Sequence, residues 1–270
     1  MSVDIETLKL LYFQNDEPCP YKLKCGYEVM LYPVKVKDWS IFERSLVLFQ
    51  IDKNKINDIE VIKMSELDFV IKLCEQNEDY SLCLANILLY SMHEQNVALS
   101  TLNNKNVIAF CDENDNTKGY ITHNEFNDIK KIILYQNIYD YKDMYVDPDV
   151  QQLYDDYYKI KNKNSKTPTL EEQKTYVLSK CSFTMKEINE MSYRMFSQIY
   201  KHAIGDIIYI GRKIIQGSYK YQVDDFQHPL YEKEKDRFAE IFEDTSVLSN
   251  KGISGAEQLN SLNLSQSLNK

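Results

Sequence analysis

The sequence has no closely spaced cysteine pair. Its 270 residues include six cysteines, and no two of them form a C-x-x-C pair or fit the spacing of a zinc site. We therefore expect reduced thiols that act as small buried apolar side chains, as is usual in a reducing compartment. The six are Cys19, Cys25, Cys74, Cys83, Cys111 and Cys181.

Long apolar runs and basic clusters are also missing. No run of about 18 apolar residues predicts a membrane span. The opening stretch MSVDIETLKLLYF has acidic residues where a secretory leader needs a basic region. The net charge of -9 and the small number of arginines argue against binding to a phosphate backbone or to an anionic membrane surface. We expect neither nucleic acid nor membrane as a partner.

The common catalytic motifs do not occur. There is no G-x-S-x-G elbow, Walker A loop, G-x-G-x-x-G fingerprint or H-E-x-x-H pair. No two of the four histidines are four residues apart. We predict no catalytic residue, no metal and no cofactor. A small enzyme with a site assembled from distant residues stays open as an alternative.

One stretch, Asn114–Phe126, resembles a calcium-binding loop. With Gly119 at the sixth loop position, the fifth position is Lys118, and Glu125 is the only carboxylate among the ligand positions. Calcium needs six to eight oxygen ligands, and an ammonium group repels it. The sequence therefore predicts a turn glycine at Gly119 and a helix cap made by Thr122 and Glu125.

Strand and helix patterns are mixed in residues 1–120. Residues 1–36 look extended, and Pro33 favours an edge strand or a strand end in Tyr27–Val36. Apolar spacing and helix caps then predict helices, and two short apolar runs around a polar turn predict a hairpin. The three helices and the hairpin are expected within Lys37–Ile51, Met64–Gln76, Asp79–Glu94 and Asn106–His123.

The second half of the chain is strongly helical. Three Thr-x-x-Glu boxes, beginning at Thr122, Thr169 and Thr184, mark helix starts, and Pro148 marks another. A helix is favoured through Ile215. We predict an α+β fold with a small mixed part (1–120), a predominantly helical part (121–244) and a flexible, disordered C-terminal tail (245–270), whose leucines could alternatively form a short docking helix.

Tyrosine and aspartate alternate in Asn137–Lys163. Tyrosine supplies a large contact area at low entropic cost and is enriched in protein interfaces. We interpret the stretch as a partner-binding face on an acidic helix. The alternative is a solvated helix with Leu153, Tyr157 and Ile160 buried. The predicted partner-binding residues are Tyr139, Tyr141, Tyr145, Tyr154, Tyr157, Tyr158, Asp155 and Asp156.

Several strings between Glu28 and Phe242 carry a family resemblance. They include YPVKVKDWSIF, IDKNKINDIEVIKMSELDFV, ITHNEFNDIKKIILYQN, the Asp-Pro helix with its KNKNSKTPTLEEQ linker, and DDFQHPLYEKEKDRFAEIF. Together they resemble tail assembly chaperones or small tail and baseplate proteins of tailed bacteriophages with Gram-positive hosts. These strings are helix-start and packing motifs, and the resemblance implies no catalytic residues.

The resemblance implies a non-enzymatic morphogenesis protein. The first expectation is a tail assembly chaperone in the host cytoplasm that binds other tail proteins, such as the tape-measure protein, with self-association also possible. An acidic surface would keep such a complex soluble. The alternative is a structural component of the virion, in the tail or baseplate, which would need a stable and symmetric apolar interface.

Overall fold

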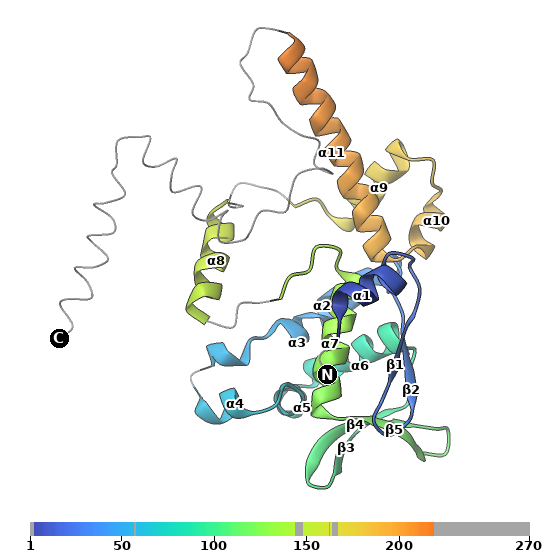
Figure 1. Cartoon of the computed structure of the whole chain (residues 1–270), viewed down its shortest axis with the longest axis vertical. Coiled ribbons are helices and arrows are strands. Elements are labelled where there is room, and N and C mark those ends of the chain that lie inside the picture. Colours follow the sequence, from blue (N-terminus) through green and yellow to red (C-terminus); the bar gives the residue numbers. More distant parts are fainter. Residues whose placement is uncertain (1–2, 57, 144–147, 162, 164–166, 219–270) are drawn as a thin grey trace, which may run out of the picture. The chain divides into compact units, whose positions relative to one another are not determined.

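The computed structural model describes residues 3–56, 58–143, 148–161, 163 and 167–218. The chain divides into two compact units, which are described separately below. The first comprises Met1–Asp143 and Pro168–Ile208, and the second comprises Met144–Thr167 and Tyr209–Lys270. Most described elements are helices, and two small sheets lie in the first unit (Figure 1). The predicted α+β class is confirmed, and the predicted tail lies outside the described residues.

The prediction that residues 1–36 are extended is wrong for the first segment. Helix α1 (Ile5–Leu8) leads directly into a π-helical turn, Lys9–Phe13. The Asp4 carboxylate accepts from the Thr7 backbone N–H at 3.3 Å, which caps the first turn. Ile5 and Phe13 are buried in the core, so the helix is held by docking one apolar side.

The first sheet has two strands. β1 (Cys19–Lys22) pairs antiparallel with β2 (Glu28–Leu31), with Cys19 opposite Leu31. The strand expected in Tyr27–Val36 therefore ends before Pro33. Proline cannot donate to a sheet ladder, and this favours a strand end at that point.

The described residues between the two sheets form six helical segments, four of which match the three predicted helices and confirm them. The other two, Lys53–Lys55 and Ile59–Lys63, were not predicted. Ser65 caps the helix that begins at Glu66, because its hydroxyl accepts from the Asp68 backbone N–H at 3.1 Å. Leu67 and Val70 on the following helix are buried in the core. The segments are α2 (Trp39–Ser45), α3 (Val47–Gln50), the 3₁₀ turn η2 (Lys53–Lys55), α4 (Ile59–Lys63), α5 (Glu66–Gln76) and α6 (Glu78–Met92).

The second sheet has three antiparallel strands in the order β3-β4-β5. They are β3 (Val97–Leu102), β4 (Lys105–Cys111) and β5 (Thr117–Ile121). The predicted hairpin is confirmed as β4 and β5. β3 precedes it across a two-residue turn, in which Asn103 and Asn104 have φ angles of 52° and 59°. Two successive positive φ angles make a type I′ turn, the form that suits the twist of a hairpin.

Gly119 is not a turn glycine, and this prediction is wrong. It is buried within β5 and pairs with Phe110. A Cβ at this position would lie 2.6 Å from the Tyr27 Cβ and 2.7 Å from its Cγ. Glycine is needed here because the Tyr27 side chain packs directly on the strand backbone.

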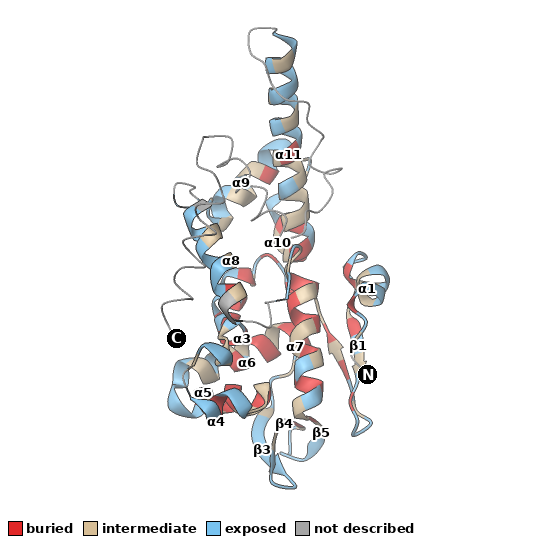
Figure 2. Cartoon of the chain, turned by 60° about the vertical axis from the view of Figure 1, so that its left-hand side comes forward, coloured by how far each residue is buried: buried red, intermediate tan, exposed pale blue. Residues whose placement is uncertain are grey.

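Helix α7 (His123–Asn137) runs through the core of the first unit (Figure 2). The predicted Thr122–Glu125 capping box is confirmed at its start. Its buried apolar side chains pack with those of β4, α5 and the first sheet, so the predicted boundary near residue 120 falls inside this unit. These side chains are Phe126, Ile129, Ile132, Ile133 and Leu134.

The remaining helices confirm the other helix starts. α8 (Pro148–Lys161) begins at the predicted proline, and Asp147 lies outside the described residues. α9 (Leu170–Lys180) and α10 (Met185–Glu190) each begin with the predicted box. α11 (Tyr193–Gly217) continues through Ile215, as expected. A small second core in the first unit packs α9, α10 and α11 together and contains Val36, Val177, Ile188 and Phe196.

Candidate interaction surfaces

Three of the predicted partner-binding tyrosines lie on α8. The ring centroids of Tyr154 and Tyr158 are 4.5 Å apart, and those of Tyr157 and Tyr158 are 5.2 Å apart with the rings edge to face. All three tyrosines are half-buried. Asp155 and Asp156 are exposed beside them, and the Asp155 carboxylate accepts from the Gln151 amide at 2.7 Å.

The alternative interpretation of α8 is wrong for two of its three residues. That interpretation required Leu153 and Ile160 to be buried, but they are 54% and 75% exposed. Only Tyr157 is partly covered. The helix therefore presents both apolar side chains and a cluster of contacting aromatic rings at its surface, a composition typical of a contact surface.

The other predicted tyrosines lie elsewhere. The Tyr139 ring lies under two cations of α11, with Arg194 Cζ at 5.3 Å and Lys201 Nζ at 5.5 Å from its centroid. Tyr141 packs against the main core and contacts the Tyr135 ring edge to face at 4.9 Å. Both belong to the first unit and have packing partners there, and Tyr145 lies outside the described residues.

Arg194 was not identified from the sequence, although it joins two helices. It is only 8% exposed. Its Nη1 donates to the Tyr135 carbonyl at 2.7 Å and to the Ile138 carbonyl at 3.3 Å. These carbonyls lie at the C-terminal end of α7, where a helix favours a cation. Burial lowers the pKa of Arg194 from its ordinary value.

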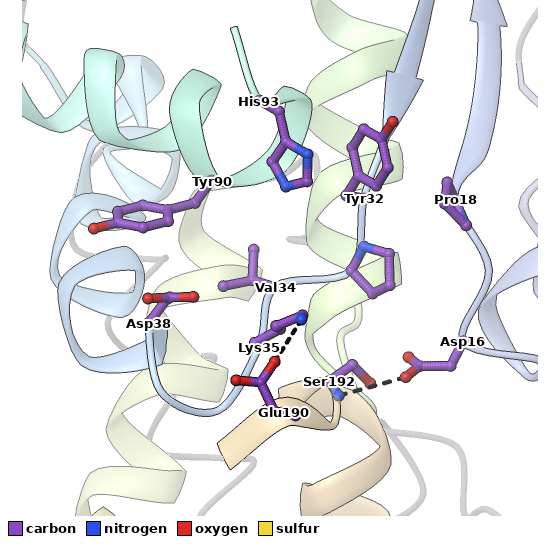
Figure 3. Close-up of a pocket in the computed structure, with 11 residues that line it drawn as sticks. Asp16, Pro18, Tyr32, Val34, Lys35, Asp38, Tyr90, His93, Glu190 and Ser192 are labelled. Atoms are coloured by element: carbon purple, nitrogen blue, oxygen red, sulfur yellow. Dashed lines mark hydrogen bonds and ion pairs between the residues drawn. The ribbon is translucent and has the colours of Figure 1, made fainter. Parts of the chain in front are cut away.

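A cavity of about 320 Å³ lies beside the C-terminal end of α6 (Figure 3). The Tyr32 and His93 rings stack on its wall with centroids 4.0 Å apart. On the opposite side, Glu190 accepts from Lys35 Nζ at 2.6 Å and from Lys37 Nζ at 2.8 Å. The two lysines hold the pKa of Glu190 at about 2, so this carboxylate stays ionised and is a poor proton donor at neutral pH.

His93 in this cavity has a structural role. It ends α6 with a φ of 58°, and its backbone N–H donates to the Leu89 carbonyl. Histidine is one of the residues enriched in this left-handed conformation. Within the described residues, no group of three or more His, Cys, Asp or Glu side chains is arranged to hold a metal ion.

A second cavity, of about 330 Å³, lies at the start of α7 and is partly lined by Lys24, Lys105 and His123. A helix start with lysines beside it would favour an anion. Here the buried Glu125 carboxylate already occupies that position. It accepts from the Thr122 backbone N–H at 2.9 Å and from the Lys24 backbone N–H at 2.5 Å. The helix start is thus already bonded to an internal carboxylate.

Isoleucines form an exposed stripe along α11, which we call the α11 stripe. They recur at spacings of three and four, so they share one face of the helix. Their exposed fractions reach 68% at Ile214. Gly211 lies on the same face, and apart from its chain neighbours and the nearby backbone of α11, no described atom lies within 4 Å of the position of its absent Cβ. The stripe consists of the exposed Ile207, Ile208, Ile214 and Ile215 together with the half-buried Ile204 and Gly211.

Comparison with known proteins returned no relative. No family model, no curated protein and no solved structure matches the chain. Among the described residues, no helix is long and apolar enough to cross a bilayer. The surfaces above must therefore be interpreted from their own chemistry.

Proposed function

We propose that the chain is a non-enzymatic binding protein, a tail assembly chaperone of a tailed bacteriophage. The observation that carries the proposal is the α11 stripe. Soluble proteins seldom expose a continuous apolar face unless another protein covers it. A helix with apolar residues at i, i+3, i+4 and i+7 is the form in which one helix enters the groove of a partner.

Two further features support this proposal. The exposed Leu153 and Ile160 and the clustered tyrosines add a second contact surface on α8. The net charge of -9 would keep a complex with an apolar client in solution. Several sequence strings resemble those of phage tail proteins, and this resemblance is the reason for proposing a long helical tail protein, such as the tape-measure protein, as the client.

The test is co-expression with the tape-measure protein of the same phage. The chaperone proposal predicts that the two proteins co-purify, and that the chain is missing from mass spectra of purified particles. Ile214→Lys should weaken the complex at least tenfold, since it places a charge in the stripe. Gln216→Lys is the matched control, because it adds the same charge on the opposite side of α11.

Two results would contradict the proposal. Equal binding by Ile214→Lys and Gln216→Lys would remove the α11 stripe from the interface. Recovery of the chain from purified particles at a fixed copy number would identify a virion component instead of a chaperone.

A further inference from the structure

Strand β3 forms an open edge of the second sheet. Within the described residues it pairs with β4 alone, and the order β3-β4-β5 leaves its outer side without a strand. Five of its six residues are exposed, and Leu99 and Leu102 are 46% and 39% exposed. The β3–β4 hairpin lies at the periphery of the first unit, and Figure 2 shows β3 in the colour of exposed residues.

The register fixes which backbone groups face outward. The two-residue turn makes Leu102 and Lys105 a hydrogen-bonded pair, and such pairs then alternate along the ladder. The Cys111 N–H donates to the Asn96 carbonyl at 2.9 Å, which agrees with this alternation. The N–H and C=O groups of Val97, Leu99 and Thr101 therefore point away from β4.

Nothing in β3 protects this edge. Natural sheets guard an open edge with lysine, proline, a bulge or a covering segment. The sequence of β3 is VALSTL, with no charge and no proline, although 27% of the whole chain is charged. Its register with β4 is regular over all six residues. An unguarded apolar edge of this kind is suited to pairing with another strand.

We propose that β3 pairs antiparallel with β3 of a second copy of this chain, with the two-fold axis at Leu99. In this register Leu99 faces Leu99 of the second copy, and Val97 faces its Thr101. All six outward N–H and C=O groups of each strand then find partners. The two sheets become one continuous six-stranded sheet.

The side chains favour a second copy as the occupant. A two-fold pairing places the axis residue against its own copy, so a charge there would meet a like charge. β3 carries none. Leucine meets leucine at the axis, and valine meets threonine on either side, which are favourable cross-strand pairs. The inference goes beyond the proposed function and stands without it.

Ionic strength gives a first signature of this dimer. Each copy has a net charge of -9, so two copies repel each other at long range. Salt screens that repulsion and leaves the uncharged strand pair intact. We therefore expect the dissociation constant to fall as sodium chloride is raised from about 20 mM to about 300 mM.

The decisive experiment is sedimentation of the full chain with charges placed on the axis. Wild-type protein should approach twice the monomer mass as its concentration rises. Leu99→Lys and Leu99→Glu should each remain monomeric, because like charges meet at the axis. Their equimolar mixture should dimerise again, because opposite charges then meet. Leu82→Lys, at a leucine of α6 that is 60% exposed, is the matched control and should behave as wild type.

Amide hydrogen exchange supplies an independent readout. The Leu99 and Thr101 amides should gain protection as the protein concentration rises. The Ser100 and Leu102 amides, which donate to β4, should be protected at every concentration. Circular dichroism confirms that each variant is folded.

Three results would overturn the proposal. One is a wild-type chain that stays monomeric at several hundred micromolar in high salt. The second is a dimer that Leu99→Lys leaves intact. The third is a failure of the mixed charge variants to associate, which would show that β3 receives a different strand or a different register.

Discussion

Replacing Gly119 with alanine should destabilise the protein, although alanine is normally preferred to glycine within a strand. Without a neighbour, Gly119→Ala would stabilise the fold by roughly 0.5–1 kcal/mol, since alanine loses less conformational entropy. Here the new Cβ would lie 2.6 Å from the Tyr27 Cβ, while carbon atoms pack at roughly 3.5–4.0 Å. The strand or the tyrosine must therefore move by about 1 Å.

Tyr27 has little freedom to move. Its ring packs on Phe110 with centroids 5.7 Å apart, and its hydroxyl donates to Glu94 at 3.1 Å. The closest atom is its Cβ, which is fixed to the backbone. Overpacking of this kind costs roughly 1–3 kcal/mol. Because neither partner can yield easily, we expect a loss of about 2 kcal/mol in the free energy of unfolding.

Urea denaturation of four proteins measures this effect as a double-mutant cycle: wild type, Gly119→Ala, Tyr27→Gly and the double variant. Removing the Tyr27 side chain should abolish the cost, so that Gly119→Ala becomes neutral or slightly stabilising in that background. Gly211→Ala is the control, because open space surrounds its Cβ position, and it should cause no loss. Equal destabilisation by Gly119→Ala with and without Tyr27 would refute the reasoning.

Three further predictions test the ion pairs of Glu190, the hydrogen bonds of Arg194 and the burial of Cys19. Lysine hydrogen bonds lower the pKa of Glu190 from 4.5 to about 2, so its stabilising contribution is full above pH 4.5 and is lost as the pH falls towards 2. Glu190→Gln should therefore reduce the fall in urea midpoint between about pH 5 and about pH 2.5. Arg194→Leu should lower the free energy of unfolding by about 2 kcal/mol, because it leaves two carbonyls of α7 unpaired. Burial raises the pKa of Cys19 to about 11, so a thiol reagent should modify the exposed Cys25 rapidly and Cys19 only after unfolding, as mass spectrometry of peptides will show.

Each of these expectations has a clear contrary result. An unchanged pH profile in Glu190→Gln would show that its lysine contacts do not persist in solution. Wild-type stability of Arg194→Leu would show that water replaces the guanidinium at the end of α7. Equal rates of modification at Cys19 and Cys25 would mean that the first sheet opens readily.

The helix starts could be predicted because their interactions are local. In each Thr-x-x-Glu box, the groups that bond lie within four residues, so Thr169 and Thr184 form their caps whatever surrounds them. The α+β class and the β4–β5 hairpin depend on similarly short-range patterns. By contrast, β3 has no apolar alternation of its own, and its place is set by its register with β4.

The candidate surfaces were harder to predict, because exposure depends on contacts between distant segments. The tyrosines of residues 137–163 form one group in the sequence. In the structure, Tyr139 and Tyr141 belong to the first unit, where they have packing partners, while those of α8 belong to the second. For α11 the sequence predicted a helix through Ile215, without saying which of its isoleucines are buried. Only the structure shows that no described segment covers them.

The backbone around Pro33 is hydrogen-bonded by polar side chains that are buried in the core. Strand β2 ends at Leu31, and in the described part of the chain the backbone beyond it regains a strand-type pairing only at the isolated bridge between Lys35 and Ser192. Two buried side chains at the end of α7 supply the missing bonds: Gln136 Nε2 donates to the Leu31 carbonyl at 2.9 Å, and Asn137 Oδ1 accepts from the Val34 N–H at 2.7 Å. Buried backbone groups must be paired, so a helix ending in amides replaces a strand there. A prediction from apolar periodicity places such amides at the surface, because it considers only whether each side chain is polar. It contains no information about a distant backbone group that needs a hydrogen-bond partner.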